Sequence, residues 1–199
     1  MSSDSQMAVL FDMDGVLIDS YKAHYESWQV IASERGRTYS EEDFVAGFGR
    51  TSREVIREQW EGAADWTEAQ VAELDEAKEA AFRQILDRDF PAMPGATQLI
   101  RELHEAGFRI AVASSGPREN VELVIRRLEI APYLSAVITG DDVTLGKPNP
   151  QVFLLAAEGV EVDIHQCCVI EDAPAGVAAA KAPGRLASDW FDQVPIPSI

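Results

Sequence analysis

Four short apolar runs constrain this chain more than any other feature of its sequence. They are Met7–Phe11, Phe108–Ala113, Ala136–Thr139 and Cys167–Ile170. Each is followed by a polar or glycine-rich turn and then by a helical pattern. Short continuous apolar runs are typical of strands that are buried on both faces. Because strands that alternate with helices favour a parallel sheet, the sequence predicts a doubly wound α/β core.

The stretch between the first two runs shows helical patterns only. Ser20–Arg35 carries apolar residues at helical spacing. Thr51 with Glu54, and Thr67 with Gln70, have the spacing of a capping box, which opens a helix. We therefore expect several helices here and no strand.

This pattern divides the chain into an α/β core of residues 1–19 and 90–199 and a helical insert of residues 20–89, which we interpret as a lid. The tail Arg185–Ile199 shows no strand period. It predicts a truncated or altered C-terminus. Without a further strand, the run Cys167–Ile170 would lie at an open edge of the sheet.

The charge balance excludes some classes of function. Lys and Arg number 17 against 34 Asp and Glu, a formal net charge of −17. Such a surface repels nucleic acid and anionic membranes, and no apolar run reaches membrane-spanning length. The N-terminus lacks the features of a signal peptide. The neighbouring residues Cys167 and Cys168 are poorly placed for a structural disulfide, so we expect reduced thiols and a cytoplasmic location.

The first apolar run ends in two carboxylates, Asp12 and Asp14, followed by Gly15. Ligands of open α/β sheets bind at the carboxyl ends of the strands. Two like charges this close destabilise each other unless a cation shares them. Carboxylate oxygens suit Mg²⁺, so this motif predicts a magnesium site.

Polar groups also follow the other three runs. Ser114 ends the second, Lys147 lies in a Gly-Lys-Pro-Asn-Pro turn after the third, and Glu171 and Asp172 end the fourth. Each alone has an ordinary interpretation, as a turn residue, a solvated lysine or a helix cap. Together they would converge on one edge of the sheet. Carboxylates, a hydroxyl and a lysine are the groups that phosphoryl transfer requires.

The order of these motifs resembles the haloacid dehalogenase-like superfamily. The resemblance rests on Asp-x-Asp-Gly-Val, then Ser, then Gly-Lys-Pro-x-Pro, then Glu-Asp, and it extends from about Val9 to Gly184. It implies a Rossmann-like core, with the helical insert after the first strand as a cap.

The resemblance also implies roles for the residues. Asp12 would attack phosphorus and form an aspartyl-phosphate, and Asp14 would act as general acid and then as general base. Ser114 and the neighbouring Ser115 would bind the phosphoryl oxygens. Lys147 would let a carboxylate approach a phosphate dianion.

The implied cofactor is Mg²⁺. The ion would be held by Asp12, the main-chain carbonyl of Asp14 and Asp172. Glu171 would act through water or would contact these ligands without binding the ion. The carboxylate at position 14 favours phosphate ester chemistry, because branches with other chemistry carry other residues there.

Some features resemble the β-phosphoglucomutase branch of the superfamily. His24, Arg50 and Lys78 are candidate substrate-binding residues in the helical insert. However, Ser52 stands where that branch has an arginine, and Ser114 is followed by a different sequence. A mutase needs a second phosphate site, whereas hydrolysis does not.

We therefore favour a Mg²⁺-dependent phosphatase that hydrolyses a small phosphorylated metabolite. A mutase acting on sugar phosphates is the alternative, and a non-catalytic binding protein of the same fold is a third hypothesis. The sequence predicts neither the metabolite nor the oligomeric state.

Overall fold

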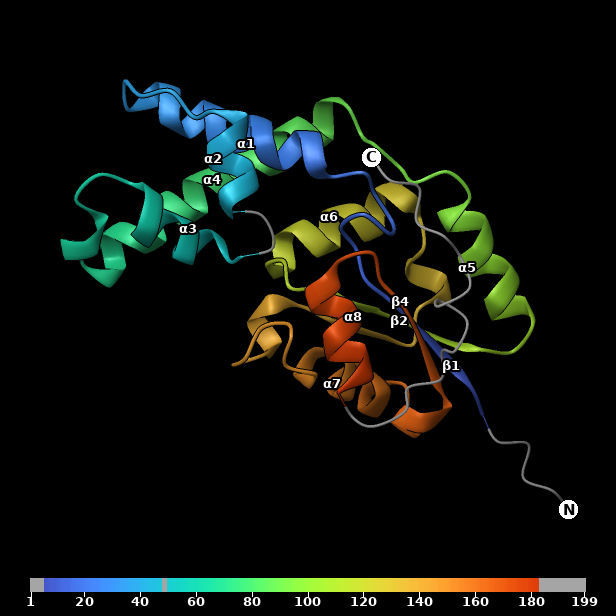
Figure 1. The fold of residues 1–199 in the computed structure, drawn as a ribbon. Coiled ribbons are helices and arrows are strands. Elements are labelled where there is room, and N and C mark those ends of the chain that lie inside the picture. Colours follow the sequence, from blue (N-terminus) through green and yellow to red (C-terminus); the bar gives the residue numbers. More distant parts are fainter. Residues whose placement is uncertain (1–5, 48–49, 183–199) are drawn as a thin grey trace, which may run out of the picture. The chain divides into compact units, whose positions relative to one another are not determined.

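The structure of the chain is a computed structural model that describes residues 6–47 and 50–182. Its contacts divide the chain into two compact units (Figure 1). The core unit comprises Met1–Ile18 and Ala92–Ile199, and the helical unit comprises Asp19–Pro91. The prediction of an altered C-terminus falls on residues 183–199, outside the described part of the chain.

The core unit contains a parallel sheet in which the strands follow the order β3-β2-β1-β4. The strands are β1 (Ala8–Phe11), β2 (Arg109–Ala113), β3 (Ala136–Ile138) and β4 (Cys167–Ile170). They coincide with the four apolar runs to within one residue at each end. The predicted α/β class with a parallel, Rossmann-like sheet is confirmed.

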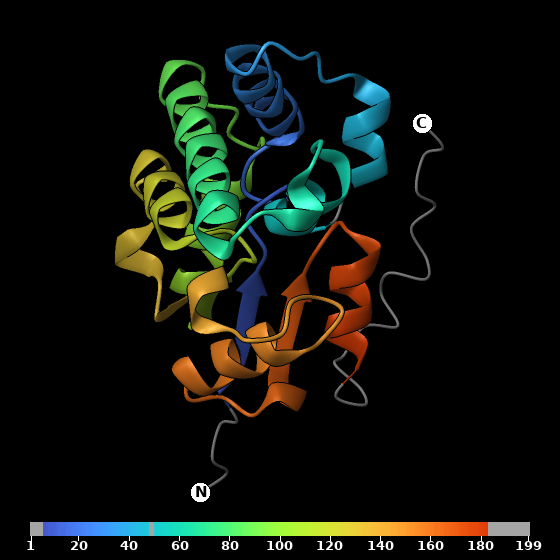
Figure 2. The same ribbon diagram turned by 90° about the vertical axis from the view of Figure 1, so that its left-hand side faces the viewer.

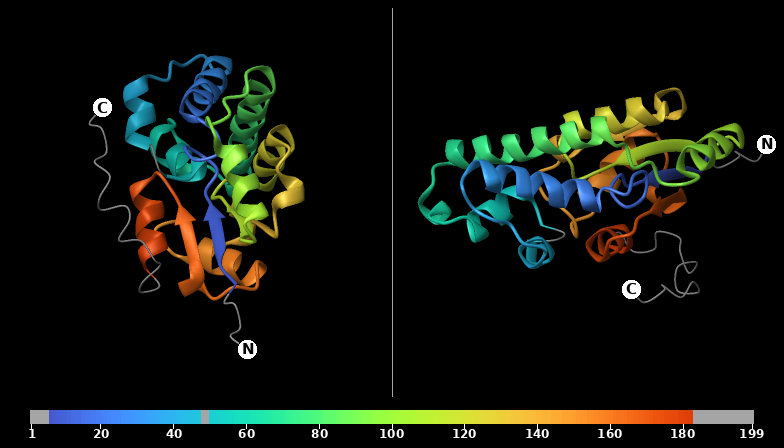
Figure 3. Two further views of the ribbon diagram at one scale, coloured as in Figure 1. Left: turned by 90° about the vertical axis from the view of Figure 1, so that its right-hand side faces the viewer. Right: turned by 90° about the horizontal axis from the view of Figure 1, so that it is seen from above.

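Helices pack against both faces of this sheet because alternate strand residues point to opposite sides. Leu10 and Ala111 share one apolar cluster with Phe153 and Ala157 of α7 (Gln151–Gly159). Helix α8 (Pro174–Lys181) contributes to the same cluster and lies beside β4 (Figure 2). Helices α5 (Ala96–Glu105) and α6 (Arg118–Leu128) lie on the opposite side (Figure 3, right). Both faces are therefore covered, as continuous apolar strands require.

The helical unit contains α1 (Tyr21–Glu34), α2 (Glu41–Gly47), α3 (Ser52–Gln59) and α4 (Glu68–Arg88). Both predicted capping boxes are present at the starts of α3 and α4. Helix α2 was not predicted. It begins with the same device, because Ser40 and Asp43 exchange backbone-to-side-chain hydrogen bonds. Short 3₁₀ turns connect the elements of both units: η1 (Ala63–Asp65), η2 (Ala131–Tyr133), η3 (Gly140–Asp142) and η4 (Ile164–Gln166).

The two segments that join the units run side by side. Ile18 forms an antiparallel bridge with Ala92. On one side of this bridge the Met93 amide donates to the Leu17 carbonyl, at 2.9 Å. On the other side the Asp19 amide donates to the Pro91 carbonyl, also at 2.9 Å. The insert therefore leaves and re-enters the core at adjacent points.

Two further expectations concern single features. Cys167 and Cys168 are free thiols, and Cys167 lies in the apolar cluster of the sheet. Across residues 6–47 and 50–182, no helix has both the length and the apolar character needed to cross a bilayer.

Phe153 gives a test of the packing beneath the sheet edge. Its side chain is fully buried, whereas the side chain of its neighbour Leu154 is 41% exposed. We predict that Phe153→Ala lowers the free energy of unfolding by about 3–5 kcal/mol, because it removes buried apolar surface and leaves a cavity. Leu154→Ala, the control, should cost less than about 1 kcal/mol. Urea denaturation monitored by circular dichroism measures both, and equal losses would contradict this packing.

Candidate active site

The register of the parallel strands places the predicted site residues at one edge of the sheet. Phe11 pairs with Val112 of β2 and with Ile170 of β4. The Asp12 amide continues this ladder by donating to the Ile170 carbonyl, at 3.0 Å. Because the next residue after Ile170 is Glu171, the two carboxylates leave neighbouring strands at the same level. They are 159 positions apart in the chain.

Lys147 joins these two carboxylates. Its Nζ donates to Asp12 Oδ1 at 2.8 Å and to Glu171 Oε2 at 2.6 Å. The ammonium also lies over the Phe153 ring, 5.1 Å from the ring centre. Only 10% of the Lys147 side chain is exposed. The lysine is therefore a fixed, mostly desolvated positive charge beside Asp12.

An acidic group surrounds this lysine. Carboxylate oxygens of Asp12, Glu171 and Asp172 all lie within 4.8 Å of one another. Asp12 and Glu171 are buried, and Asp172 is exposed. Three hard oxygen donors within this distance, one of them open to solvent, fit a Mg²⁺ ion that keeps some of its water. The donor set contains no thiolate or imidazole, which softer metals prefer.

Gly15 makes room for one of these acids. A Cβ atom on Gly15 would lie 2.0 Å from Asp172 Oδ2, so only glycine allows the carboxylate to lie there. The φ angle of Gly15 is +73°, which side chains rarely adopt. Gly15 of the first motif thus leaves the space that the Asp172 carboxylate of the last motif occupies. Asp14, between Asp12 and Gly15, is half-buried.

Burial and like charges change the protonation of this site. Burial, partly opposed by Lys147 and reinforced by Glu171 and Asp14, raises the pKa of Asp12 from 3.8 to about 7. Burial would lower the pKa of Lys147, but the Asp12 and Glu171 carboxylates outweigh it and raise that pKa. Burial, with Glu171, also raises the pKa of Asp172. One ammonium does not compensate all these carboxylates, so the site has an electrostatic demand for another cation.

Ser114 begins the loop after β2. Its side chain is fully buried, and its Oγ accepts a hydrogen bond from the Gly116 amide at 3.0 Å. The amide of Ser114 extends the sheet by donating to the Ile138 carbonyl, at 3.0 Å. Ser115 is exposed. Since the Ser114 oxygen accepts from the backbone, its own proton is left to donate elsewhere.

The turn after β3 packs against the Ser114 loop. Sequence reasoning did not identify this turn as part of the site. A Cβ on Gly140 would lie 2.4 Å from the Ser115 carbonyl oxygen, and the Gly140 amide donates to the Gly116 carbonyl at 2.8 Å. Thr139 and Asp142 form a capping box around this turn. Their spacing is a sequence signal that could have identified it. The fit between the two turns limits where Ser114 and Ser115 can lie.

Arg118 adds a second link between the same two turns. Its amide donates to Asp141 Oδ2 at 2.9 Å, and its guanidinium donates to Asp142 Oδ1 at 2.7 Å. Arg118 follows the Ser114 loop, and the two aspartates follow β3. The loop is therefore held by a backbone contact and by charged hydrogen bonds.

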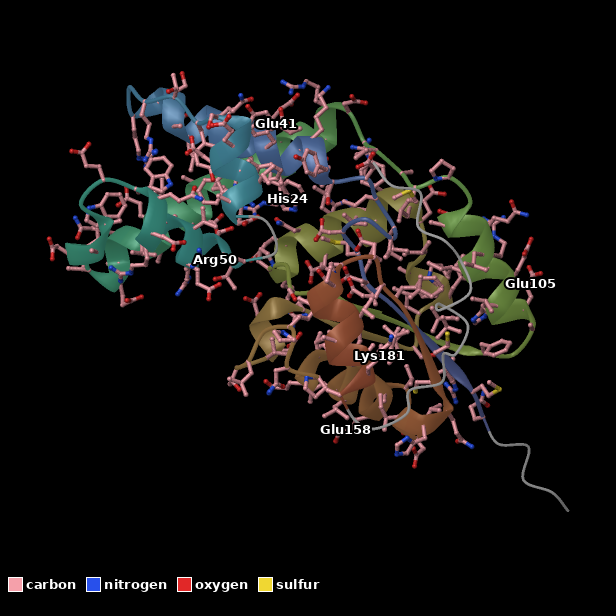
Figure 4. The ribbon with its side chains drawn as sticks, viewed as in Figure 1. His24, Glu41, Arg50, Glu105, Glu158 and Lys181 are labelled. Atoms are coloured by element: carbon pink, nitrogen blue, oxygen red, sulfur yellow. The ribbon has the colours of Figure 1, made fainter. Side chains whose placement is uncertain are left out.

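Of the three candidates in the helical unit, His24 and Lys78 are in contact, whereas Arg50 contacts another residue. Lys78 Nζ lies 3.0 Å from His24 Nδ1 and 2.8 Å from Glu79 Oε1. Arg50 forms an ion pair with Glu58. Figure 4 labels His24 on α1 and Arg50, which precedes the N-cap of α3. Sequence reasoning identified His24 and Lys78 as candidates but did not identify Glu79, which accepts a hydrogen bond from Lys78.

Comparison with known proteins gives a consistent result. Residues 6–184 match the family model described as haloacid dehalogenase-like hydrolase. The chain is 34% identical over 178 residues to validoxylamine A 7′-phosphate phosphatase of Streptomyces hygroscopicus subsp. limoneus, covering 88% of this chain and 81% of that protein. It is 31% identical over 185 residues to β-phosphoglucomutase of Bacillus subtilis (strain 168), covering 90% and 81%.

A solved structure supports the same grouping. The crystal structure of CbbY from Rhodobacter sphaeroides in complex with phosphate matches with a TM-score of 0.79 and 26% identity. The match covers 90% of this chain and 83% of that one. The fold, the motif order and both sets of relatives thus agree.

The raised pKa of Asp12 predicts a pH-dependent stability of the metal-free protein. Between pH 3.8 and about 7 the folded state binds the Asp12 proton more tightly than the unfolded chain. Stability from this group is therefore lost as the pH rises through that window. In the presence of a chelator, Asp12→Asn should raise Tm at pH 8 by several degrees and by clearly less at pH 5.

Differential scanning calorimetry measures both values. Glu158→Gln, which removes an exposed carboxylate on α7, is the control and should leave Tm nearly unchanged at either pH. A lower Tm for Asp12→Asn at pH 8 would show that Lys147 already compensates the site.

Proposed function

We propose a hydrolytic function from one premise: the chain belongs to the haloacid dehalogenase-like hydrolase family. The proposed activity is the Mg²⁺-dependent hydrolysis of a small phosphomonoester through an aspartyl-phosphate on Asp12. The observation that carries it is the position of Lys147 between Asp12 and Glu171 at the carboxyl edge of the sheet. A carboxylate beside a fixed ammonium can approach a phosphate dianion, which an isolated carboxylate cannot.

In the first step a carboxylate oxygen of Asp12 attacks phosphorus. A bond forms between that oxygen and phosphorus, and the ester bond to the leaving oxygen breaks. Asp14 gives its proton to the leaving oxygen, so the product is a neutral alcohol. In the second step Asp14 takes a proton from water, which attacks the aspartyl-phosphate. Inorganic phosphate leaves, and Asp12 is restored.

The proposed metal ligands are Asp12, the main-chain carbonyl of Asp14 and Asp172. Glu171 would bind the ion through water, or would contact these ligands without binding the ion itself. Mg²⁺, when bound, would neutralise phosphate oxygens and offset the repulsion among these carboxylates. This assignment is supported by the close grouping of the three acids and by the glycine that makes room for Asp172.

The loop after β2 would bind the phosphoryl oxygens. The Ser114 hydroxyl, whose oxygen already accepts from the Gly116 amide, has its proton available for a phosphoryl oxygen. The exposed backbone at Ser115 would supply a further donor. His24, Arg50 and Lys78 of the helical unit remain the proposed contacts to the rest of the substrate.

A mutase remains the second candidate, because a relative with 31% identity bears that name. Incubation with β-glucose 1-phosphate and a catalytic amount of the 1,6-bisphosphate distinguishes the two. A mutase yields glucose 6-phosphate, and the proposed phosphatase releases inorganic phosphate.

The role of Asp12 gives the first activity test. We expect p-nitrophenyl phosphate to be hydrolysed with Mg²⁺. Asp12→Asn should lower kcat by at least about 10³-fold because the nucleophile is lost. Chelation should also lower kcat strongly, because the carboxylates would then repel the phosphate. Beryllofluoride should bind wild-type protein and fail to bind Asp12→Asn. Unchanged turnover in Asp12→Asn would refute the mechanism, and wild-type protein that binds no beryllofluoride would support a non-catalytic role.

Gly140 tests whether the supporting turn positions the phosphate-binding loop. Gly140→Ala should lower kcat/KM by roughly tenfold or more, because its Cβ would collide with the Ser115 carbonyl. Gly146→Ala is the matched control, since a Cβ there would meet nothing within 4 Å. Equal effects of the two substitutions on kcat/KM would contradict a positioning role for Gly140.

A further inference from the structure

Gly176 of α8 lies directly against the Glu171 carboxylate. A Cβ atom on Gly176 would lie 2.0 Å from both Glu171 Cδ and Oε2, and 2.5 Å from Oε1. The Glu171 side chain is only 3% exposed, and Gly176 is buried. The helix and the carboxylate are therefore packed so closely that not even one methyl group fits between them.

The backbone does not account for this glycine. Its φ angle lies outside the left-handed region that favours glycine, and it is the third residue of α8, after Pro174 and Ala175. Alanine stabilises a helix better than glycine does. The same helix has alanine at all three positions of Ala178–Ala180. The physical reason for glycine at position 176 is then the space that the carboxylate occupies.

The carboxylate in this space has a defined orientation. Its Oε1 accepts from the Ala173 amide at 3.0 Å, and its Oε2 accepts from Lys147 Nζ at 2.6 Å. The same Nζ donates to Asp12 Oδ1 at 2.8 Å. Of the two oxygens, Oε2 lies nearer to Gly176. A carboxylate displaced from α8 would therefore lose or move the hydrogen bond that fixes the ammonium.

The two acids at the end of β4 each lie against a glycine. Asp172 lies against Gly15 of the first motif, and Glu171 lies against Gly176 of α8. Asp172 remains exposed, whereas Glu171 is buried and holds Lys147. All these residues belong to the core unit.

From this geometry we infer that Gly176 is a positioning residue for the reaction. It acts through Glu171, whose carboxylate holds Lys147 beside Asp12. The inference rests on the proposed function, in which the ammonium lets the Asp12 carboxylate approach a phosphate. Such a contact must be accurate, because a displacement of about 1 Å can cost about 10²-fold in rate.

Gly176→Ala tests the inference, with Ala178→Gly as the matched control. Ala178 is an exposed residue of the same helix, so the control exchanges the same two residue types at a position that faces solvent. Hydrolysis of p-nitrophenyl phosphate with Mg²⁺ is measured for both. Gly176→Ala should lower kcat/KM by at least about tenfold. Ala178→Gly should change it by less than about twofold, although only the control lowers helix propensity.

A double-mutant cycle separates positioning from a general disturbance of α8. In a Glu171→Ala background, the carboxylate that the new Cβ would meet is absent. Gly176→Ala should therefore cost less than about twofold in kcat/KM there, whereas a general disturbance would cost the same factor in both backgrounds. Equal factors overturn the inference.

Reductive methylation of the metal-free protein gives a readout that needs no turnover. Peptide mass spectrometry follows each lysine, and Lys22, whose side chain is 78% exposed, is the internal reference. Lys147 is 10% exposed and donates to two carboxylates, so it should react slowly in the wild type. Gly176→Ala should raise its rate relative to Lys22 by at least about threefold, because loss of one hydrogen bond opens the amine to the reagent. Ala178→Gly should leave this ratio unchanged.

Each result supports or overturns the inference. An unchanged kcat/KM, or an unchanged Lys147 labelling rate, in folded Gly176→Ala overturns it and leaves the proposed function standing. If the wild-type protein hydrolyses no phosphomonoester, the proposed function fails, and the positioning role of Gly176 fails with it. If Gly176→Ala does not fold, its combination with Glu171→Ala should fold again, because the collision is with that side chain. A double variant that stays unfolded overturns the inference as well.

Discussion

The structure depends on one ammonium held among several carboxylates at the ends of parallel strands. In-register pairing of β1 with β2 and β4 brings Asp12 and Glu171 to the same edge, and Lys147 joins them from the loop after β3. Without the lysine, buried like charges would repel each other at close range. Two other residues fit this arrangement. The ring of Phe153 lies under the Lys147 ammonium, and Gly15 leaves space for the Asp172 carboxylate.

Lys147, which is mostly buried, and Lys78, which is buried, illustrate opposite electrostatic conditions. Lys147 faces more carboxylates than it can compensate, so the pKa of Asp12 rises to about 7 and a further cation would be stabilised there. Lys78 faces one buried carboxylate, Glu79, and the pair sums to zero. The first condition favours the binding of a further cation. In the second, the buried carboxylate already compensates the lysine.

Much of this arrangement could be predicted because its signals are local or follow from sheet topology. The capping boxes at Thr51 and Thr67 are fixed-spacing patterns. The meeting of Asp12 with Lys147, 135 positions apart, follows once both are placed after strands of one parallel sheet. Glu79 could not be found this way. Adjacent helical residues usually point apart, so nothing in the sequence indicates that Glu79 reaches Lys78. Gly140 was missed for a similar reason, since its close approach to Ser115 depends on how two turns pack.

A chain of net charge −17 that acts on an anion must concentrate positive charge where the reacting group binds. At the sheet edge that charge is Lys147 with the proposed metal ion. In the helical unit the corresponding charge is cancelled by a residue one position away on α4.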